Sequence, residues 1–281
     1  MSDLHAFNEA LNKRAGRRLI PSILVGLGLL AIIFTTLTFA PIIFAAFVTT
    51  AVLLALRELT GAFAARGISI KYPQVAIATI AILLSAWFGG LPGLSVSIVV
   101  AVISLLFIQL LSGIDGFVRN ATGNTFVLLY PGFVAGFIFL LARSGDGFAY
   151  ITTLVILVGV NDTFAYLTGL AIGRHPLAPK ISPKKTWEGF FGGMLFTSIA
   201  SALAFNLLLD HHYLIGAIAG ILGVIAATVG DLIESAIKRD LALKDMGTLL
   251  PGHGGMLDRL DSALITAPVF WCVIELLKRF G

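Results

Sequence analysis

Residues 214–234 read LIGAIAGILGVIAATVGDLIE, an almost uniformly apolar run that is long enough to cross a bilayer as a helix. Similar runs recur along the chain near 19–39, 41–56, 75–91, 94–111, 125–142, 148–172, 190–209 and 262–277. Hydrophobic blocks of this length, separated by short polar connections, are typical of transmembrane helices. The sequence therefore predicts an all-α, polytopic integral membrane protein with about nine transmembrane helices.

The composition of the whole chain agrees with this interpretation and excludes an ordinary soluble domain. Of the 281 residues, 58% are hydrophobic and only 12% are charged, whereas a soluble domain carries about 25% charged residues. We expect one integral membrane domain over residues 19–281, preceded by a polar cytoplasmic segment over residues 1–18. The only cysteine, Cys272, lies in a predicted span, so the chain cannot form an intrachain disulfide.

The basic residues indicate how the chain is oriented. If the N-terminus lies in the cytoplasm, all but three of the 19 Lys and Arg residues fall on the cytoplasmic side, the exceptions being Arg143, Lys278 and Arg279. This bias follows the positive-inside rule and accounts for the net charge of +4 without a nucleic-acid partner. We therefore expect a multi-pass protein of the plasma (inner) membrane, with the loops 173–189 and 238–261 in the cytoplasm.

Two parts of this topology stay open. The runs 41–56 and 262–277 are short, and little more than Ala40-Pro41 separates the first run from the second. A re-entrant pair is therefore an alternative, with eight or ten spans in place of nine. The mixed segment 57–74 is either a plain cytoplasmic connection or one that contains an interfacial helix.

Carboxylates and a lysine gather at the cytoplasmic end of the run 214–234. Asp231, Glu234, Ser235 and Lys238 are spaced i, i+3, i+4, i+7 and so share one face of a helix. A carboxylate inside an apolar run is costly unless it has a partner, which makes Asp231 a candidate functional residue. For Glu234 the alternative is structural, an intrahelical pair with Lys238.

A second polar face begins the last apolar run, with Asp258, Asp261 and Ser262 at i, i+3, i+4. Helix capping explains one of these aspartates, but not two of them beside Arg259. If the two helix ends pack together, Asp231, Asp258 and Asp261 converge. Clustered hard oxygen ligands, completed by substrate phosphates, suit Mg²⁺.

Two cytoplasmic loops carry groups that suit phosphates. The turn PGHGG, residues 251–255, contains three glycines, which permit positive φ and a close approach of backbone N–H groups. Its His253 either contacts the substrate or orders the loop. The loop GRHPLAPKISPKKTWEG, residues 173–189, contains three prolines, which predict a rigid, non-helical segment up to Thr186 or Trp187. Its hydroxyl and ammonium groups suit a polyphosphate, with a plain basic loop as the alternative: Ser182, Lys184, Lys185 and Thr186.

One further carboxyl lies inside the run 148–172, in the pair Asn161-Asp162. An aspartate within a span is a functional candidate, here as a further metal or substrate contact. The alternative is that both side chains form hydrogen bonds with neighbouring helices.

These motifs resemble the signature of bacterial CDP-diglyceride synthase, also called phosphatidate cytidylyltransferase. The signature is filled, with the expected spacing, by Ser235, Lys238-Arg239, Lys244-Asp245, His253-Gly254-Gly255, Asp258-Arg259 and Asp261. The loop ISPKKTWEG, residues 181–189, and Asn161-Asp162 also resemble the family. The resemblance is strong over residues 155–265, which we take as the catalytic half of the domain, and only general before them.

The resemblance implies a homodimeric membrane enzyme that converts CTP and phosphatidate into CDP-diacylglycerol and pyrophosphate. It implies Mg²⁺ as a cofactor, with a second cation such as K⁺ as an additional expectation. Asp231, Asp258 and Asp261 are expected to hold the metal. Residues expected to neutralise phosphates are Lys238, Arg239, Lys244 and Arg259, and residues expected to bind substrate are Ser182, Lys184, Lys185, Thr186, Ser235, His253, Gly254, Gly255, Asn161 and Asp162.

Two other functions fit parts of the pattern. A secondary transporter would use Asp162 and Asp231 as ion sites, but no inverted repeat is visible and the charges gather on one side. A CTP-dependent lipid kinase would instead transfer the γ-phosphate, and the mass of the lipid product distinguishes it from a cytidylyltransferase.

Overall fold

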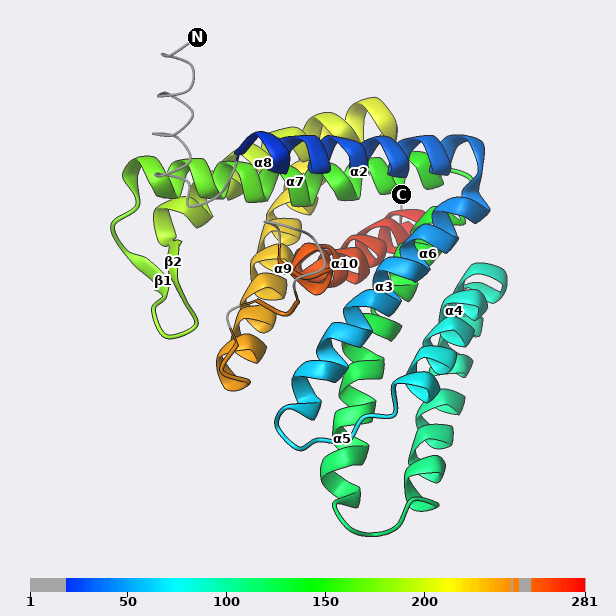
Figure 1. Ribbon diagram of the computed structural model, residues 1–281. Helices are drawn as coiled ribbons and strands as arrows, with labels where there is room; N and C mark the ends of the chain where they lie inside the picture. The colour runs from blue at the N-terminus through cyan, green and yellow to red at the C-terminus, as the bar shows by residue number, and fades with distance from the viewer. Residues whose placement is uncertain (1–18, 244, 248–253, 281) are drawn as a thin grey trace.

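The computed structural model describes residues 19–243, 245–247 and 254–280, and helices dominate it (Figure 1). The helices are α2 (Leu19–Phe39), α3 (Pro41–Ala64), α4 (Tyr72–Leu110), α5 (Phe117–Val127), the π-helix η1 (Leu128–Phe133), α6 (Gly136–Ala142), α7 (Gly147–Ile172), α8 (Trp187–Leu208), α9 (Tyr213–Asp240) and α10 (Leu257–Phe280). Seven helical spans within the described ranges are long and apolar enough to cross a membrane. The predicted all-α membrane fold is therefore confirmed.

The spans differ in detail from the predicted runs. Helix α4 contains both the run 75–91 and the run 94–111, and it reverses direction at Gly90, whose backbone has φ 64° and ψ −150°. Helices α3 and α10 each have 24 residues, so both extend beyond the short apolar runs 41–56 and 262–277. The segment 57–74 is not one connection either, since its first part continues α3 as far as Ala64. The count of nine spans stays a prediction.

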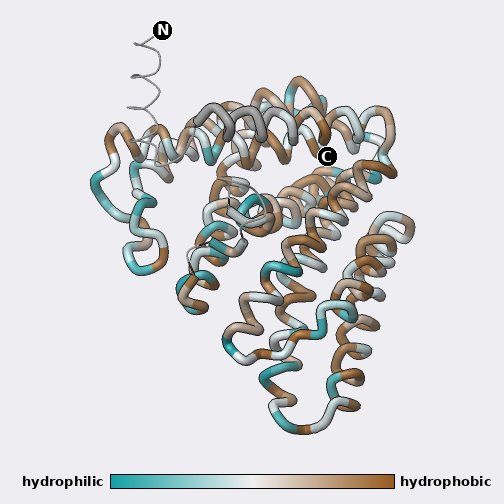
Figure 2. Tube along the Cα trace, viewed as in Figure 1, coloured by the Kyte–Doolittle hydropathy of each residue, from teal (hydrophilic) through white to brown (hydrophobic). Residues whose placement is uncertain are grey.

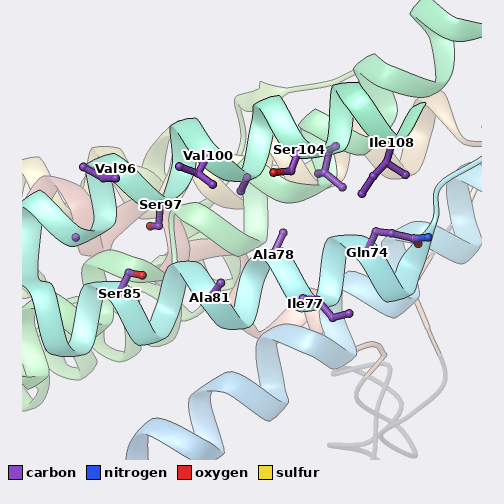
Figure 3. Close-up of a pocket in the computed structure, with 13 residues that line it drawn as sticks. Gln74, Ile77, Ala78, Ala81, Ser85, Val96, Ser97, Val100, Ser104 and Ile108 are labelled. Carbon is purple, nitrogen blue, oxygen red and sulfur yellow. The ribbon is translucent and has the colours of Figure 1, made fainter. Parts of the chain in front are cut away.

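The reversal at Gly90 makes α4 a hairpin with two arms. A side chain at this position would collide with the guanidinium group of Arg143, which also donates a hydrogen bond of 3.5 Å to the Phe88 carbonyl. Figure 3 shows the arms facing each other through small side chains such as Ala81 and Ser97. A cavity of about 560 Å³ lies between the arms.

Helix α10 occupies the centre of the molecule. It contacts α3, η1, α6, α7 and α9, and therefore joins elements from both halves of the chain. Helices α7, α8 and α9 pack in sequence against one another, while the α4 hairpin packs beside α5, η1 and α6 (Figure 1). In Figure 2 the α4 hairpin is largely hydrophobic, whereas hydrophilic residues gather in the β-hairpin and at the nearby end of α9.

Polar residues near the ends of the helices contact one another in two separate regions. The Ser69 amide donates to Asn120 Oδ1 over 2.9 Å, and the Arg66 side chain donates to the Leu241 carbonyl over 3.2 Å. Elsewhere Lys278 lies 5.4 Å from the ring centre of Tyr150, near the start of α7. Residues near helix ends that are far apart in sequence therefore lie next to one another.

A short antiparallel hairpin interrupts the helices, with strands β1 (Pro176–Ala178) and β2 (Ser182–Thr186). Proline cannot donate to an intrahelical hydrogen bond, so the three prolines of this loop exclude a helix. Helix α8 begins at Trp187 because Thr186 acts as its N-cap and accepts a 3.1 Å hydrogen bond from the Gly189 amide. The predicted non-helical loop up to Thr186 is confirmed, although its strands were not expected.

Candidate active site

The end of α9 and the start of α10 pack closely, which is the condition under which the sequence analysis expected their aspartates to converge. A Cβ atom at Gly230 would lie only 2.4 Å from the Asp261 carbonyl oxygen, so the absence of a side chain sets the helix separation. One residue further along α10, the Ser262 hydroxyl donates to the Ala227 carbonyl over 3.2 Å. This packing brings the two polar faces toward each other.

Lys238 connects these faces. Its Nζ lies 2.5 Å from Glu234 Oε2 on the same helix and 2.6 Å from Asp258 Oδ1 on α10. The intrahelical pair that was the alternative for Glu234 is therefore present. Glu234 is only 1% exposed, and its Oε1 has no hydrogen-bond partner among the described residues. Lys238, expected to neutralise a phosphate, holds two carboxylates together in this structure.

Asp258 also organises the start of α10. Its Oδ2 accepts hydrogen bonds from the Gly255 amide over 2.7 Å and from the Met246 amide over 3.2 Å. The nearby Gly254 has a positive φ of 76°, a conformation that glycine adopts without strain, as expected for the glycines of this turn. Both oxygens of Asp258 are thus engaged by protein groups.

Asp231 joins the β-hairpin to the helices. Its Oδ2 lies 2.8 Å from Lys185 Nζ on β2, and its Oδ1 accepts a 3.3 Å hydrogen bond from the Ser235 hydroxyl. Arg239 adds a second connection, because its Nε donates to the Ile181 carbonyl over 3.1 Å. The two loops that the sequence singled out therefore meet at the end of α9.

Three carboxylates from different helices share this region. The negative charges of Asp162 on α7, Asp231 on α9 and Asp261 on α10 interact with one another, and Lys185 and Arg259 interact with Asp162. Asp162 follows directly after Asn161 on α7, and the Asn161 side chain is only 4% exposed. Asn161 donates to Asp162 Oδ1 over 3.3 Å, so this amide holds a carboxylate at the site.

The donor chemistry of these carboxylates fits Mg²⁺. No group of three His, Cys, Asp or Glu side chains within the described ranges is arranged as a complete metal site. Mg²⁺ commonly binds one or two carboxylates and completes its shell with water and substrate phosphates, so such a group is not required. Asp231, Asp258 and Asp261 all supply hard oxygens, although Asp231 pairs with Lys185 and Asp258 with Lys238, and the three-aspartate assignment stays a prediction.

The remaining predicted site residues fall into three groups: accessible, engaged in helix capping, or outside the described residues. On β2, Lys184 is exposed and Ser182 is half-buried, so both are accessible. Thr186, expected to bind substrate, caps α8. Lys244 and His253 lie outside the residues that the structure describes.

Two residues near the site were missed by the sequence analysis. Tyr130, in η1, is buried, and its hydroxyl interacts with the charges of Asp231, Glu234 and Asp261. Glu58, in α3, accepts hydrogen bonds from the start of α10. The available signals were a Tyr-Pro-Gly break in an apolar run for Tyr130 and a carboxylate directly after an apolar run for Glu58.

Comparisons with known proteins agree with this geometry. A phosphatidate cytidylyltransferase of Mycobacterium leprae (strain TN) is 35% identical over 280 residues, which cover 94% of this chain and 90% of that protein. A phosphatidate cytidylyltransferase of Staphylococcus aureus (strain COL) is 41% identical over 136 residues, or 48% of this chain and 52% of the relative. The uncharacterized protein YnbB of Escherichia coli (strain K12) is 48% identical over 122 residues, or 43% and 41% of the two chains.

The model of one protein family extends over nearly the whole chain. It matches residues 21–277, and therefore includes α3 and α4 as well as the charged elements around α9 and α10. The family model matches most of the chain, and the relative from Mycobacterium leprae is similar over 94% of it. The chain therefore belongs to the cytidylyltransferase family.

Proposed function

We propose that this protein catalyses the reaction of CTP with phosphatidate to give CDP-diacylglycerol and pyrophosphate. The observation that carries the proposal is the contact of Lys185 with Asp231, which unites the β-hairpin with α9 in one charged site among apolar helices. The names of the relatives from Mycobacterium leprae and Staphylococcus aureus support the same activity. A site at the end of spanning helices also lets the acyl chains of a lipid substrate remain in the bilayer.

In the proposed reaction an oxygen of the lipid phosphate attacks the α-phosphorus of CTP. A new P–O bond forms, the bond between the α-phosphorus and its bridging oxygen to the β-phosphorus breaks, and pyrophosphate leaves with that electron pair. A phosphate monoester carries most of its second negative charge near pH 7, since its second pKa is about 6. The nucleophile is therefore already anionic, and the main barrier is repulsion between two polyanions.

Basic residues of three elements are placed to reduce this repulsion. Lys184 and Lys185 come from β2, Arg239 from the end of α9 and Arg259 from the first turn of α10. Fixed cations of this kind stabilise charge that develops at the transferring phosphate and on the leaving group. Lys238 acts differently, because it holds Glu234 and Asp258 in place.

Mg²⁺ is part of the proposal, with Asp231, Asp258 and Asp261 as the carboxylates that would hold it. When bound, the ion would neutralise phosphate charge. A second cation such as K⁺ and a homodimeric assembly are further parts of the proposal. Both rest on the family resemblance.

We also propose that the site faces the cytoplasm. The connections assigned to the cytoplasm contact one another, as Arg66 does with the end of α9. Those assigned to the outside do the same, as Arg143 does with the turn of the α4 hairpin. This pairing supports the division of the connections between two opposite sides, and the distribution of basic residues then assigns the charged side to the cytoplasm of a plasma membrane.

The test is product mass after incubation of purified protein with phosphatidate, α-³²P-CTP and Mg²⁺. A labelled lipid with the mass of CDP-diacylglycerol is expected, and EDTA should abolish it. Label that enters lipid only from γ-³²P-CTP would identify a lipid kinase instead. Folded protein that forms no labelled lipid from either nucleotide would reject the proposal.

A further inference from the structure

Glu58 of α3 contacts the first turn of α10, 198 residues further along the chain. Its Oε1 accepts a 2.9 Å hydrogen bond from the Met256 amide, and its Oε2 accepts a 3.0 Å hydrogen bond from the Leu257 amide. A carboxylate that accepts two adjacent backbone N–H groups from another helix is fixed in both position and orientation. The contact also joins the N-terminal half of the chain to the catalytic half.

The contact provides hydrogen-bond acceptors for backbone N–H groups at the start of α10, where the helix itself offers none. The first N–H groups of an α-helix have no intrahelical acceptor, and the partial positive charge of that end favours anions. At the start of α10, Asp258 accepts from the Gly255 amide, and Glu58 accepts from the next two amides. One carboxylate belongs to α10 and the other to α3, so the N-cap of α10 is shared between two helices.

The surrounding residues leave room for this carboxylate. A Cβ atom at Gly247 would lie 2.5 Å from Glu58 Oε1, and one at Gly255 would lie 2.5 Å from Oε2. Neither position therefore accepts a side chain without displacing Glu58. On α3, the neighbouring side chains of Leu56 and Leu59 are fully buried, which fixes the helix that carries the carboxylate.

We propose that Glu58 is a positioning residue of the active site, which acts through the N-terminus of α10 on the carboxylates of Asp258 and Asp261. Both aspartates lie within the first turns of this helix, one and four residues after Leu257. A small rotation or shift of the helix start would move both carboxylates relative to Asp231 on α9. The inference rests on the proposed cytidylyltransferase activity and adds a requirement for α3, outside the charged loops.

The test compares Glu58→Gln with the wild-type protein. The amide keeps the size of the side chain but presents an NH₂ group to one of the two backbone donors, so one hydrogen bond becomes a donor–donor contact. We expect faster hydrogen exchange at the amides of residues 256 and 257, and a kcat lower by about 100-fold, because small misplacements of reacting groups have effects of this size. The KM for CTP and the thermal midpoint should stay close to the wild-type values. Glu275→Gln is the matched control, since Glu275 lies near the opposite end of α10, where it pairs with Lys278.

A second variant reaches the same contact from the other side. Gly247→Ala keeps the Glu58 carboxylate but places a methyl group 2.5 Å from its Oε1, so the carboxylate must move, and the same loss of kcat is expected. A normal kcat in Glu58→Gln with faster exchange at 256 and 257 would overturn the proposal. The proposal would also be overturned if the thermal midpoint fell in both variants along with their activity, because the loss would then reflect reduced stability. Failure of the proposed function is recognised separately, because the wild-type protein itself would then form no CDP-diacylglycerol.

Discussion

Single residues at this site have more than one partner, and this limits what sequence spacing can predict. The pair of Glu234 with Lys238 follows from their i, i+4 spacing. The second contact of Lys238, with Asp258 on α10, depends on how two helices pack and has no sequence signal. The same holds for Lys185 with Asp231. The candidate residues and the intrahelical partner of Glu234 were identified from the sequence, but the partners on other elements were not.

Asp258→Asn should reduce turnover severely, toward complete loss, without unfolding the protein. The amide oxygen still accepts a backbone N–H at the start of α10, so the helix remains capped. The negative charge beside Lys238 is lost, and we expect turnover to fall by about 100-fold or more because preorganised charges contribute strongly to catalysis. The measurement is the rate of CDP-diacylglycerol formation together with detergent elution volume. Asp115→Asn, at an exposed position before α5, is the control; equal rates in the two variants would remove Asp258 from the site.

Whole elements were predicted where one physical rule dominates. The three prolines of residues 173–189 exclude a helix, and Thr186 is a favourable N-cap, so the start of α8 followed from the sequence. The pairing of β1 with β2 did not, because strands of three and five residues carry too little pattern. The extension of α3 to Ala64 was also missed, since Arg57 and Glu58 ended the apolar run before the helix itself ended.

The close packing of α9 on α10 gives a prediction for Gly230. Gly230→Ala places a methyl group within 2.4 Å of the Asp261 carbonyl, so the helices must separate or shift. Overpacking of this kind costs about 1–3 kcal/mol, and we expect a lower thermal midpoint together with reduced turnover. Gly159→Ala on α7 is the matched control, because nothing lies within 4 Å of the added atom there. A thermal midpoint at Gly230→Ala as high as that of the control would contradict the packing.

For the molecule as a whole, hydropathy and charge were sufficient to predict the class of fold. Helices of about 20 apolar residues and a one-sided excess of Lys and Arg both reflect the bilayer, which acts on every span in the same way. Neither indicates which helix lies next to which. The central place of α10, and with it the contribution of Glu58 from α3, depends on packing between spans and could not be predicted.

The proposed orientation can be tested with single cysteines in a Cys272→Ser background. Ala65→Cys lies in the connection after α3, and Gly145→Cys lies in the connection before α7; both positions are exposed. In sealed, right-side-out vesicles, a membrane-impermeant maleimide should label only the second variant. In inverted vesicles it should label only the first. Labelling of both variants from the same side would contradict the topology.

The position of α10 also sets the order in which the protein can be assembled during synthesis. Every helix that α10 contacts precedes it in the chain, so all of them enter the membrane before their shared neighbour is made. Until then the Glu58 carboxylate has no backbone amides of Met256 and Leu257 to bind, and Ala227 has no Ser262 hydroxyl. The active site is therefore completed only when this last helix joins the helices that precede it.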